Sequence, residues 1–292
     1  MKKTLFVFAT MIIAGVFIIL SCAKHDTSLT EINDQLKQDE KEAVTEAVLL
    51  KIDDLINKEI TNLENNNYVL SSSKSEDADL CNPKTTVNTP TNSKFPKTIT
   101  LDWGTGCTDK DGNFRAGKVI VNITGLFWDK NTVRHAKLVD YRYNDLKVEG
   151  ERKEMNKGPN EKGYIVFDIN HSEKIKDNKG VVIVERDLKR TRTCNRGKDL
   201  KTTDDDEIWV TGTAKVYNLG KERIQEITTP LYRKLTCAHF QSGIIATYIN
   251  KEKVAELDYG KGDCDNSATW TNGKVTKTVI LKTGVNYFSV KP

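Results

Sequence analysis

Glycine is distributed unevenly along this chain, and its distribution separates two regions that obey different local rules. Seventeen of the 18 glycines lie between Gly104 and Gly284, whereas the stretch from Val16 to Trp103 contains none. Glycine supplies the positive-φ turns of sheet proteins and weakens helices. We therefore expect helix in the first region and sheet in the second, with the boundary near residue 97.

Runs of alternating apolar and polar residues fill the chain from Thr98 onward. Val119, Val121 and Ile123 share one strand face in this pattern, and the alternate residues from Ile208 to Val216 share another. About a dozen such runs, among them 222–229, 231–240 and 285–290, predict a mainly β domain over 98–292, either an antiparallel sandwich or a curved, partly closed sheet. Because each strand keeps a polar face, a single large sheet wrapped over an N-terminal helix also fits the pattern.

The segment from Ser28 to about Asn65 lacks both proline and glycine and predicts one amphipathic helix. Ser28 to Glu31 has the form of a capping box, and an interruption is expected, if anywhere, near Lys37 to Glu42. We expect the apolar stripe to pack on the following domain or on a partner helix, with acids on the opposite face. The stripe consists of Val44, Val48, Ile52, Leu55, Ile56, Ile60 and Leu63.

Residues 67–97 are dominated by Asn, Ser, Thr and Lys and include three prolines. Such a composition buries too little apolar surface to order itself. We therefore expect a flexible tether there, pinned at Cys81.

The N-terminus has the pattern of a bacterial lipoprotein signal peptide over residues 1–21. Two lysines precede an apolar run from Leu5 to Leu20, and Ser21-Cys22 follows as the junction at which such signals are cut and lipidated. The run is shorter than the ~20 residues that cross hydrocarbon, which disfavours a permanent anchor helix. We expect acylation of Cys22 and a lipid-anchored location in the cell envelope, with the outer membrane as the commoner destination.

The charge of the chain is nearly balanced, with 45 basic and 41 acidic residues and a formal net charge of +4. This balance gives no electrostatic reason to expect a nucleic-acid partner. Basic stretches such as Arg186 to Arg192 alternate with apolar or acidic residues. We interpret them as solvated strand faces.

Two segments of the chain match each other and indicate an internal repeat. LDWGTGC at 101–107 and LDYGKGDC at 257–264 align at an offset of 156, and the same offset relates Gly117-Lys118 to Gly273-Lys274. Cys81 aligns with Cys237 in this register.

The repeat also indicates which cysteines form disulfides. After Cys22 is lipidated five remain, in a compartment where thiols oxidise. The repeat favours the bridges Cys81–Cys107 and Cys237–Cys264, and the rival that respects it is Cys81–Cys237 with Cys107–Cys264. Cys194 is then left over, as a buried thiol or an intermolecular partner, and we favour the buried thiol.

Asp102 and Asp258 are the first candidates for general acid–base chemistry, because each precedes an aromatic residue, Trp103 or Tyr259, and two nearby glycines. The same aspartates are typical of turns in which a carboxylate accepts backbone N–H bonds. We favour the turn, because equivalent positions in two repeats are expected to lie apart.

Candidate metal ligands are few. Asp109, Asp111 and Asn113 resemble part of a calcium loop, but the later acidic ligand is missing, so a hairpin turn is the better account. The acidic run Asp204 to Glu207 is interpreted as a solvated loop, with surface calcium as the alternative. The four histidines have no zinc-site spacing, and no phosphate-binding glycine loop occurs. We predict neither a metal nor a cofactor.

The aromatic residues raise the question of glycan binding, because rings on a sheet surface stack on sugars. Aromatic residues at strand positions are more often part of the core, so exposure decides between the two. The residues concerned are Trp103, Trp128, Trp209, Trp270, Tyr141, Tyr143 and Tyr259.

On these features the chain resembles a family of uncharacterised bacterial cell-envelope lipoproteins. The resemblance rests on Cys22 with its lipobox, an acidic N-terminal helix, the LDWGTGC block, the strand 146–150 and the closing LDYGKGDCDN block, and it covers most of residues 81–285. It implies a secreted, sheet-rich domain and carries no established activity.

Together these observations predict a lipid-anchored envelope protein whose role is binding or structural support at the membrane surface, with a glycan or an envelope protein as partner. The alternative is an envelope hydrolase or glycan-active enzyme that uses exposed carboxylates of the β domain. Binding is favoured, because the sequence supplies anchoring and scaffolding but no activated nucleophile.

Overall fold

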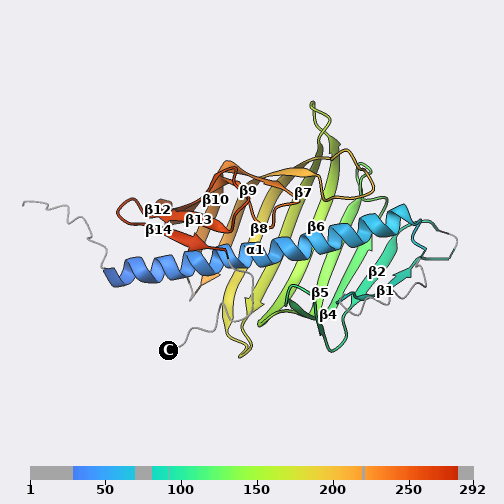
Figure 1. Ribbon diagram of the computed structural model, residues 1–292, viewed down its shortest axis with the longest axis horizontal. Helices are drawn as coiled ribbons and strands as arrows, with labels where there is room; N and C mark the ends of the chain where they lie inside the picture. The colour runs from blue at the N-terminus through green and yellow to red at the C-terminus, as the bar shows by residue number, and fades with distance from the viewer. Residues whose placement is uncertain (1–28, 70–80, 92, 219–220, 282–292) are drawn as a thin grey trace, which may run out of the picture.

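One long helix lies across one face of a single curved antiparallel sheet (Figure 1). The structure is a computed structural model and describes residues 29–69, 81–91, 93–218 and 221–281. It confirms the predicted mainly β class, in the form of an open, curved sheet rather than a sandwich. Cys22 and the signal peptide lie outside the described residues.

The sheet has 14 strands, and nearly all of them follow one another in chain order, as expected when short hairpins join neighbours. β3 is the exception, because it pairs only with β4. The strands are β1 (Lys84–Asn88), β2 (Lys97–Asp102), β3 (Cys107–Thr108), β4 (Phe114–Ile123), β5 (Val133–Tyr143), β6 (Leu146–Pro159), β7 (Ile165–Lys176), β8 (Val182–Asn195), β9 (Glu207–Asn218), β10 (Lys221–Lys234), β11 (Ser242–Ile249), β12 (Glu252–Lys261), β13 (Ser267–Thr271) and β14 (Thr276–Ile280).

Most strands lie where the alternation placed them, and both predicted apolar faces are buried. The runs 222–229 and 231–240 belong largely to one strand, β10, whose register shifts around Pro230. β1 lies within the segment expected to be a tether and pairs with β2 along its whole length. The predicted run at 285–290 lies outside the described residues.

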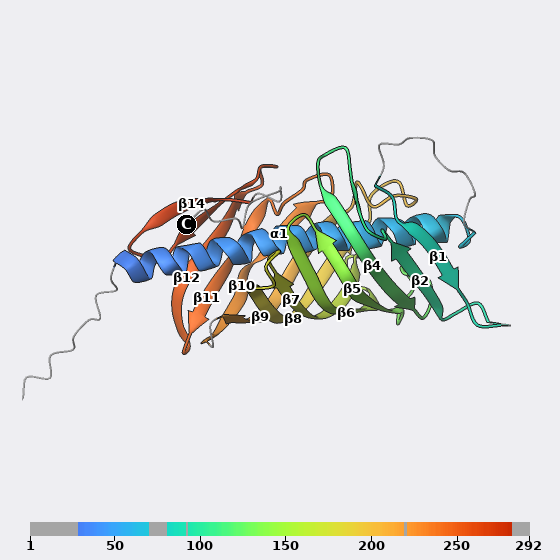
Figure 2. The same cartoon turned by 90° about the horizontal axis from the view of Figure 1, so that it is seen from below.

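Helix α1 (Leu29–Asn65) runs without interruption through Lys37 to Glu42, and the sheet curves around it (Figure 2). Every residue from Glu42 to Leu49 is buried. Ile52, Ile56 and Ile60, each 1 % exposed, continue the contact toward the C-terminal end. The helix is therefore part of the core of the domain. No helix among the described residues is both long and apolar enough to cross a membrane.

Glycines inside the strands help the sheet to curve. Gly150 in β6 and Gly212 in β9 have φ of 135° and 121°, values that L side chains rarely adopt. A Cβ added at Gly150 would lie 2.1 Å from the carbonyl oxygen of Ser172, and one at Gly212 would lie 2.3 Å from that of Lys189. At both places the backbone of a neighbouring strand approaches closely, as at the glycine kinks that bend sheets.

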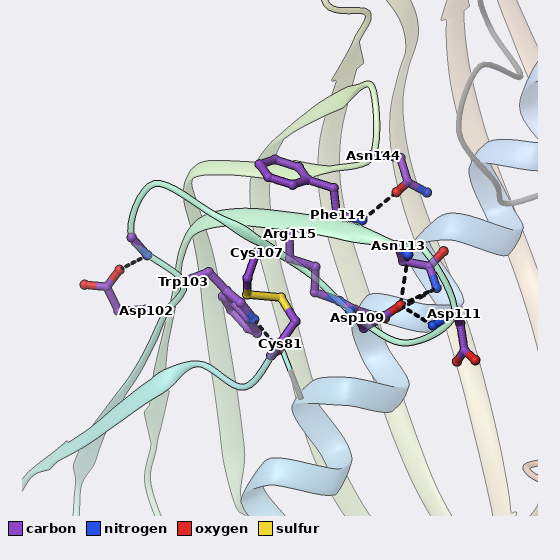
Figure 3. Close-up of a disulfide and its surroundings, with 11 residues drawn as sticks. Cys81, Asp102, Trp103, Cys107, Asp109, Asp111, Asn113, Phe114, Arg115 and Asn144 are labelled. Atoms are coloured by element: carbon purple, nitrogen blue, oxygen red, sulfur yellow. Dashed lines mark hydrogen bonds and ion pairs between the residues drawn. A yellow bond between two sulfur atoms is a disulfide. The ribbon is translucent and has the colours of Figure 1, made fainter. Parts of the chain in front are cut away.

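Both predicted disulfides, Cys81–Cys107 and Cys237–Cys264, are confirmed, with Cα–Cα distances of 5.4 and 5.6 Å. Figure 3 shows the first bridge, where the indole Nε1 of Trp103 donates to the carbonyl oxygen of Cys81 at 3.2 Å. The remaining thiol, Cys194, is buried at 3 % exposure, as expected.

Peptide mapping under non-reducing conditions tests this arrangement. We expect two bridged peptides, one containing Cys81 with Cys107 and the other Cys237 with Cys264, and alkylation of Cys194 only after unfolding. Recovery of a bridge between the two repeats would contradict the assignment.

Candidate functional site

The sheet face that contacts α1 is both apolar and strongly charged. Seven arginines on this face are at most 9 % exposed, and no lysine is buried to that extent among the described residues. Arginine suits such a position because its planar fork pairs with both oxygens of a carboxylate. The seven are Arg134 on β5, Arg152 on β6, Arg186, Arg190 and Arg192 on β8, and Arg223 and Arg233 on β10.

The helix supplies carboxylates that match these arginines, so the expectation that its acids lie opposite the packed face is wrong for these residues. Five helix acids, Asp39, Glu42, Glu46, Asp53 and Asp54, form ion pairs with sheet arginines. The sheet adds two glutamates of its own, Glu154 and Glu173. Seven arginines less two glutamates leave five positive charges on the sheet, equal to the five negative charges of the helix.

Glu46 lies at the centre of this network. Its carboxylate accepts hydrogen bonds from Arg190 at 2.5 and 3.2 Å, and from Arg186 at 2.5 Å. Burial alone would raise the pKa of Glu46, but the two guanidiniums outweigh burial and lower it to about 2. Glu46 is therefore a stable anion inside the domain.

Nearer the N-terminal end of the helix, two carboxylates share one guanidinium. Arg223 donates to Asp39 and to Glu42, and the indole of Trp270 also donates to Asp39 at 2.7 Å. Burial and the neighbouring Asp39 charge raise the pKa of Glu42 to about 7, although Arg223 opposes them. Glu42 therefore takes up a proton much more readily than Glu46, one turn further along.

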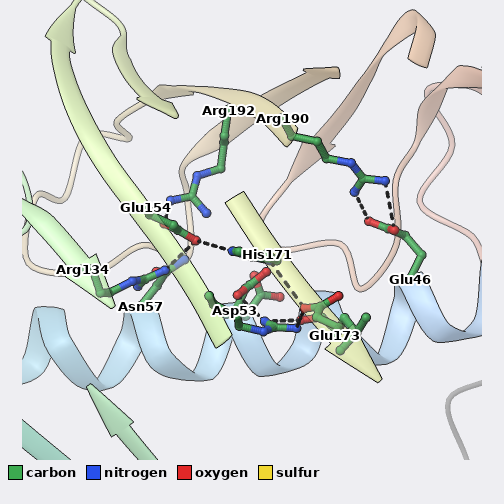
Figure 4. Close-up of polar contacts among 12 residues, drawn as sticks. Glu46, Asp53, Asn57, Arg134, Glu154, His171, Glu173, Arg190 and Arg192 are labelled. Carbon is green, nitrogen blue, oxygen red and sulfur yellow. Dashed lines mark hydrogen bonds and ion pairs between the residues drawn. The ribbon is translucent and has the colours of Figure 1, made fainter. Parts of the chain in front are cut away.

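His171 lies between two carboxylates in the middle of the sheet (Figure 4). Its Nε2 is 3.6 Å from Glu154 and its Nδ1 is 3.5 Å from Glu173. Burial would lower the pKa of His171, but the interactions with Glu154 and Glu173 outweigh it and raise the pKa. This position therefore favours the imidazolium.

Asp53, Glu154 and His171 also have the donor types of a metal site, with ligand atoms within 4.8 Å of one another. Their surroundings do not fit a divalent cation. Glu154 pairs with Arg134 and Arg192, each at 2.8 Å, and Asp53 pairs with Arg152 at 2.5 Å. A metal ion would add two positive charges beside guanidiniums that already neutralise these carboxylates. A proton on His171 suits the cluster better.

A cavity of about 50 Å³ lies between the C-terminal half of α1 and the sheet. Apolar side chains line it together with members of the charged network, among them Phe127, Phe167 and Leu50. At one end Arg196 stacks over Trp128, 3.7 Å from the ring centroid, and pairs with Asp206 at 3.1 Å. This cavity and the charged network around it form the candidate site.

The residues that the sequence singled out lie elsewhere, in turns. Asp102 accepts the backbone N–H of Gly104, and Asp258 that of Gly260, both at 2.8 Å (Figure 3 shows the first). Asp102 also pairs with Lys118 at 2.8 Å. The partner aromatics are buried, with Trp103 at 6 % and Tyr259 at 4 % exposure.

The acidic candidates for calcium also serve the local backbone. Asp109 accepts N–H groups of Asp111 and Asn113 and pairs with Arg115 (Figure 3). In the run from Asp204 to Glu207, Asp204 and Asp205 are exposed, whereas Asp206 is fully buried and accepts the N–H of Gly197 at 2.7 Å.

The aromatic residues divide between core and surface. Trp103, Trp270, Tyr141 and Tyr143 are buried, whereas Trp128 and Trp209 are half-buried. Trp209 stacks on Tyr164, with ring centroids 5.7 Å apart, and lies beside the tilted ring of Tyr232, 5.3 Å away. These contacts cover part of the Trp209 ring.

The interpretation of Arg186 to Arg192 as a solvated face is wrong. Arg186, Arg190 and Arg192 are 4, 9 and 8 % exposed and face the interior beside Leu188 and Cys194. The signal was present, because these five residues occupy alternate positions of one strand and two of them are apolar. What overturned the interpretation is an acidic partner far away in the sequence.

Comparison with known proteins gives no relative: no family model matches the chain, and no curated protein or solved structure matches it.

Glu42 and Glu46 predict opposite responses of stability to pH. The pKa of Glu46 in the folded chain, about 2, lies below its ordinary value of 4.5, so its contribution is present above pH 4.5 and is lost as the pH falls toward 2. The pKa of Glu42, about 7, lies above 4.5, so its contribution is present below pH 4.5 and is lost as the pH rises through 7.

Urea unfolding at a series of pH values measures both effects. Glu46→Gln should flatten the rise in unfolding free energy between about pH 2 and 4.5, and Glu42→Gln should flatten the fall between about pH 4.5 and 7. Asp34→Asn, at an exposed helix position, is the control and should keep the wild-type profile. Equal profiles for the two glutamine variants would contradict the assignment.

Proposed function

We propose that this protein is a lipid-anchored component of the bacterial cell envelope that acts as a binding or structural module close to the membrane. The observation that carries the proposal is the short distance in sequence between the lipidation motif and the core of the domain. Only residues 23–28 separate Cys22 from helix α1. Fully extended, that separation spans at most about 25 Å.

Because the helix is buried in the domain, a lipid anchor close to its start would hold the folded domain near the membrane. Because Glu42 to Leu49 are buried, acyl chains on Cys22 would hold the whole domain through its core. A domain held in this way stays near the bilayer. This supports a role at the membrane surface, with a glycan or an envelope protein as partner.

The ionisable groups discussed above favour a binding or structural role over a catalytic one. The seven arginines and their carboxylates beneath α1 pair mainly with one another. Asp102 and Asp258, which an envelope hydrolase or glycan-active enzyme would use, each stabilise a turn through a backbone N–H. A general acid or base needs instead to reach a substrate proton.

Metabolic labelling with a radioactive fatty acid tests the anchor. We expect the wild-type chain to carry the label and to fractionate with membranes, whereas Cys22→Ala loses the label and keeps its signal peptide. Cys194→Ala is the matched control, since this buried thiol should leave labelling unchanged. A labelled Cys22→Ala chain, or an unlabelled wild-type chain in the cytosol, would contradict the proposal.

A further inference from the structure

The cavity beneath α1 presents buried nitrogen atoms that have no hydrogen-bond partner among the described residues. Three of its lining residues contribute one such atom each: Trp128 Nε1, Arg190 Nε and Arg233 Nε. A fourth nitrogen, His171 Nε2, already faces the carboxylate of Glu154 at 3.6 Å. His171, Arg190 and Arg233 are 6, 9 and 1 % exposed. Leaving such donors without an acceptor is costly in a dry site, so they mark a place for an acceptor.

The carboxylates that line the same cavity are already engaged. Both oxygens of Glu46 accept from Arg186 and Arg190, and both oxygens of Asp54 accept from Arg233. Asp206 accepts from Arg196 and from the backbone N–H of Gly197. Asp53, the remaining carboxylate of the described lining, pairs with Arg152 at 2.5 Å. The buried polar atoms of this lining that lack a hydrogen-bond partner are therefore all nitrogen atoms, which suit an anion.

Charge balance limits that anion to a single charge. When Glu42 is ionised, the arginines and carboxylates of the network cancel, so the one further positive charge comes from the imidazolium of His171. The groups around this imidazole are Asp53 from α1, Arg134 from β5, Arg152 and Glu154 from β6, Glu173 from β7 and Arg192 from β8. A monovalent anion would neutralise this extra charge, whereas a divalent anion would leave a buried excess.

Size and lining indicate the kind of anion. A volume of 50 Å³ has room for about three or four water-sized groups. Apolar side chains, including Leu50, Phe127, Phe167 and Leu235, form much of the wall. A ligand with a compact charged end and a small apolar end fits this combination better than a halide ion does.

We propose that this cavity binds a small carboxylate anion of the size of formate or acetate, held by Trp128, Arg190 and Arg233 beside the imidazolium of His171. The inference goes beyond the proposed function, whose partner is a glycan or an envelope protein. The carboxylate oxygens accept from these three nitrogen atoms, and the apolar end lies against the aromatic wall.

The indole N–H of Trp128 provides a direct probe. The chain has four tryptophans, so protein labelled with ¹⁵N-tryptophan and solubilised in detergent should give four indole N–H resonances. Adding sodium acetate should shift one of them saturably, and Trp128→Phe should remove the resonance that shifts. Trp209→Phe is the matched control, because Trp209 lies among other rings away from the cavity and its loss should leave the shift intact.

One further variant and one salt control complete the test. Leu50→Phe places a larger side chain in the wall and should weaken acetate binding at least tenfold, with the Trp128 resonance still present to report it. Sodium chloride at matched ionic strength should produce no saturable shift. The proposal fails if acetate leaves the Trp128 resonance in place, or if chloride shifts it as strongly. Neither result would bear on the proposed lipid anchor, because fatty-acid labelling of Cys22 tests that proposal separately.

Discussion

The pairing of helix carboxylates with sheet arginines is the interaction on which the rest of this structure depends. Five acids of α1 neutralise the five positive charges that the sheet face carries in excess. Without the helix, seven guanidiniums would face one another with only Glu154 and Glu173 to offset them. Since a buried charge without a partner is strongly destabilising, the curved sheet and the helix need each other.

The charged pairs do more than hold the helix against the sheet. A purely apolar interface would be at least as stable, because buried ion pairs seldom add stability over well-packed apolar groups. The paired charges instead fix the register of the helix. Glu46 meets β8 and Asp54 meets β10 through forked contacts that a shift of one residue would break.

Elements set by local rules could be predicted from the sequence, and contacts between distant elements could not. Alternation placed β5 and β9, spacing placed α1, and the repeat selected both disulfides. Buried Arg190 was misread because its partner, Glu46, lies 144 positions earlier in the chain. No local pattern says which face of a strand a distant helix will cover, so the candidate site emerged only in three dimensions.

A double-mutant cycle on Asp54 and Arg233 tests the central claim most directly. This pair joins α1 to β10, and Asp54 is the only acidic partner of Arg233 among the described ion pairs. Urea unfolding of Asp54→Asn, Arg233→Met and the double variant should give a coupling free energy of about 1.5–3 kcal/mol. A coupling below about 0.5 kcal/mol would mean that the two changes simply add, which would contradict a domain held together by helix–sheet ion pairs.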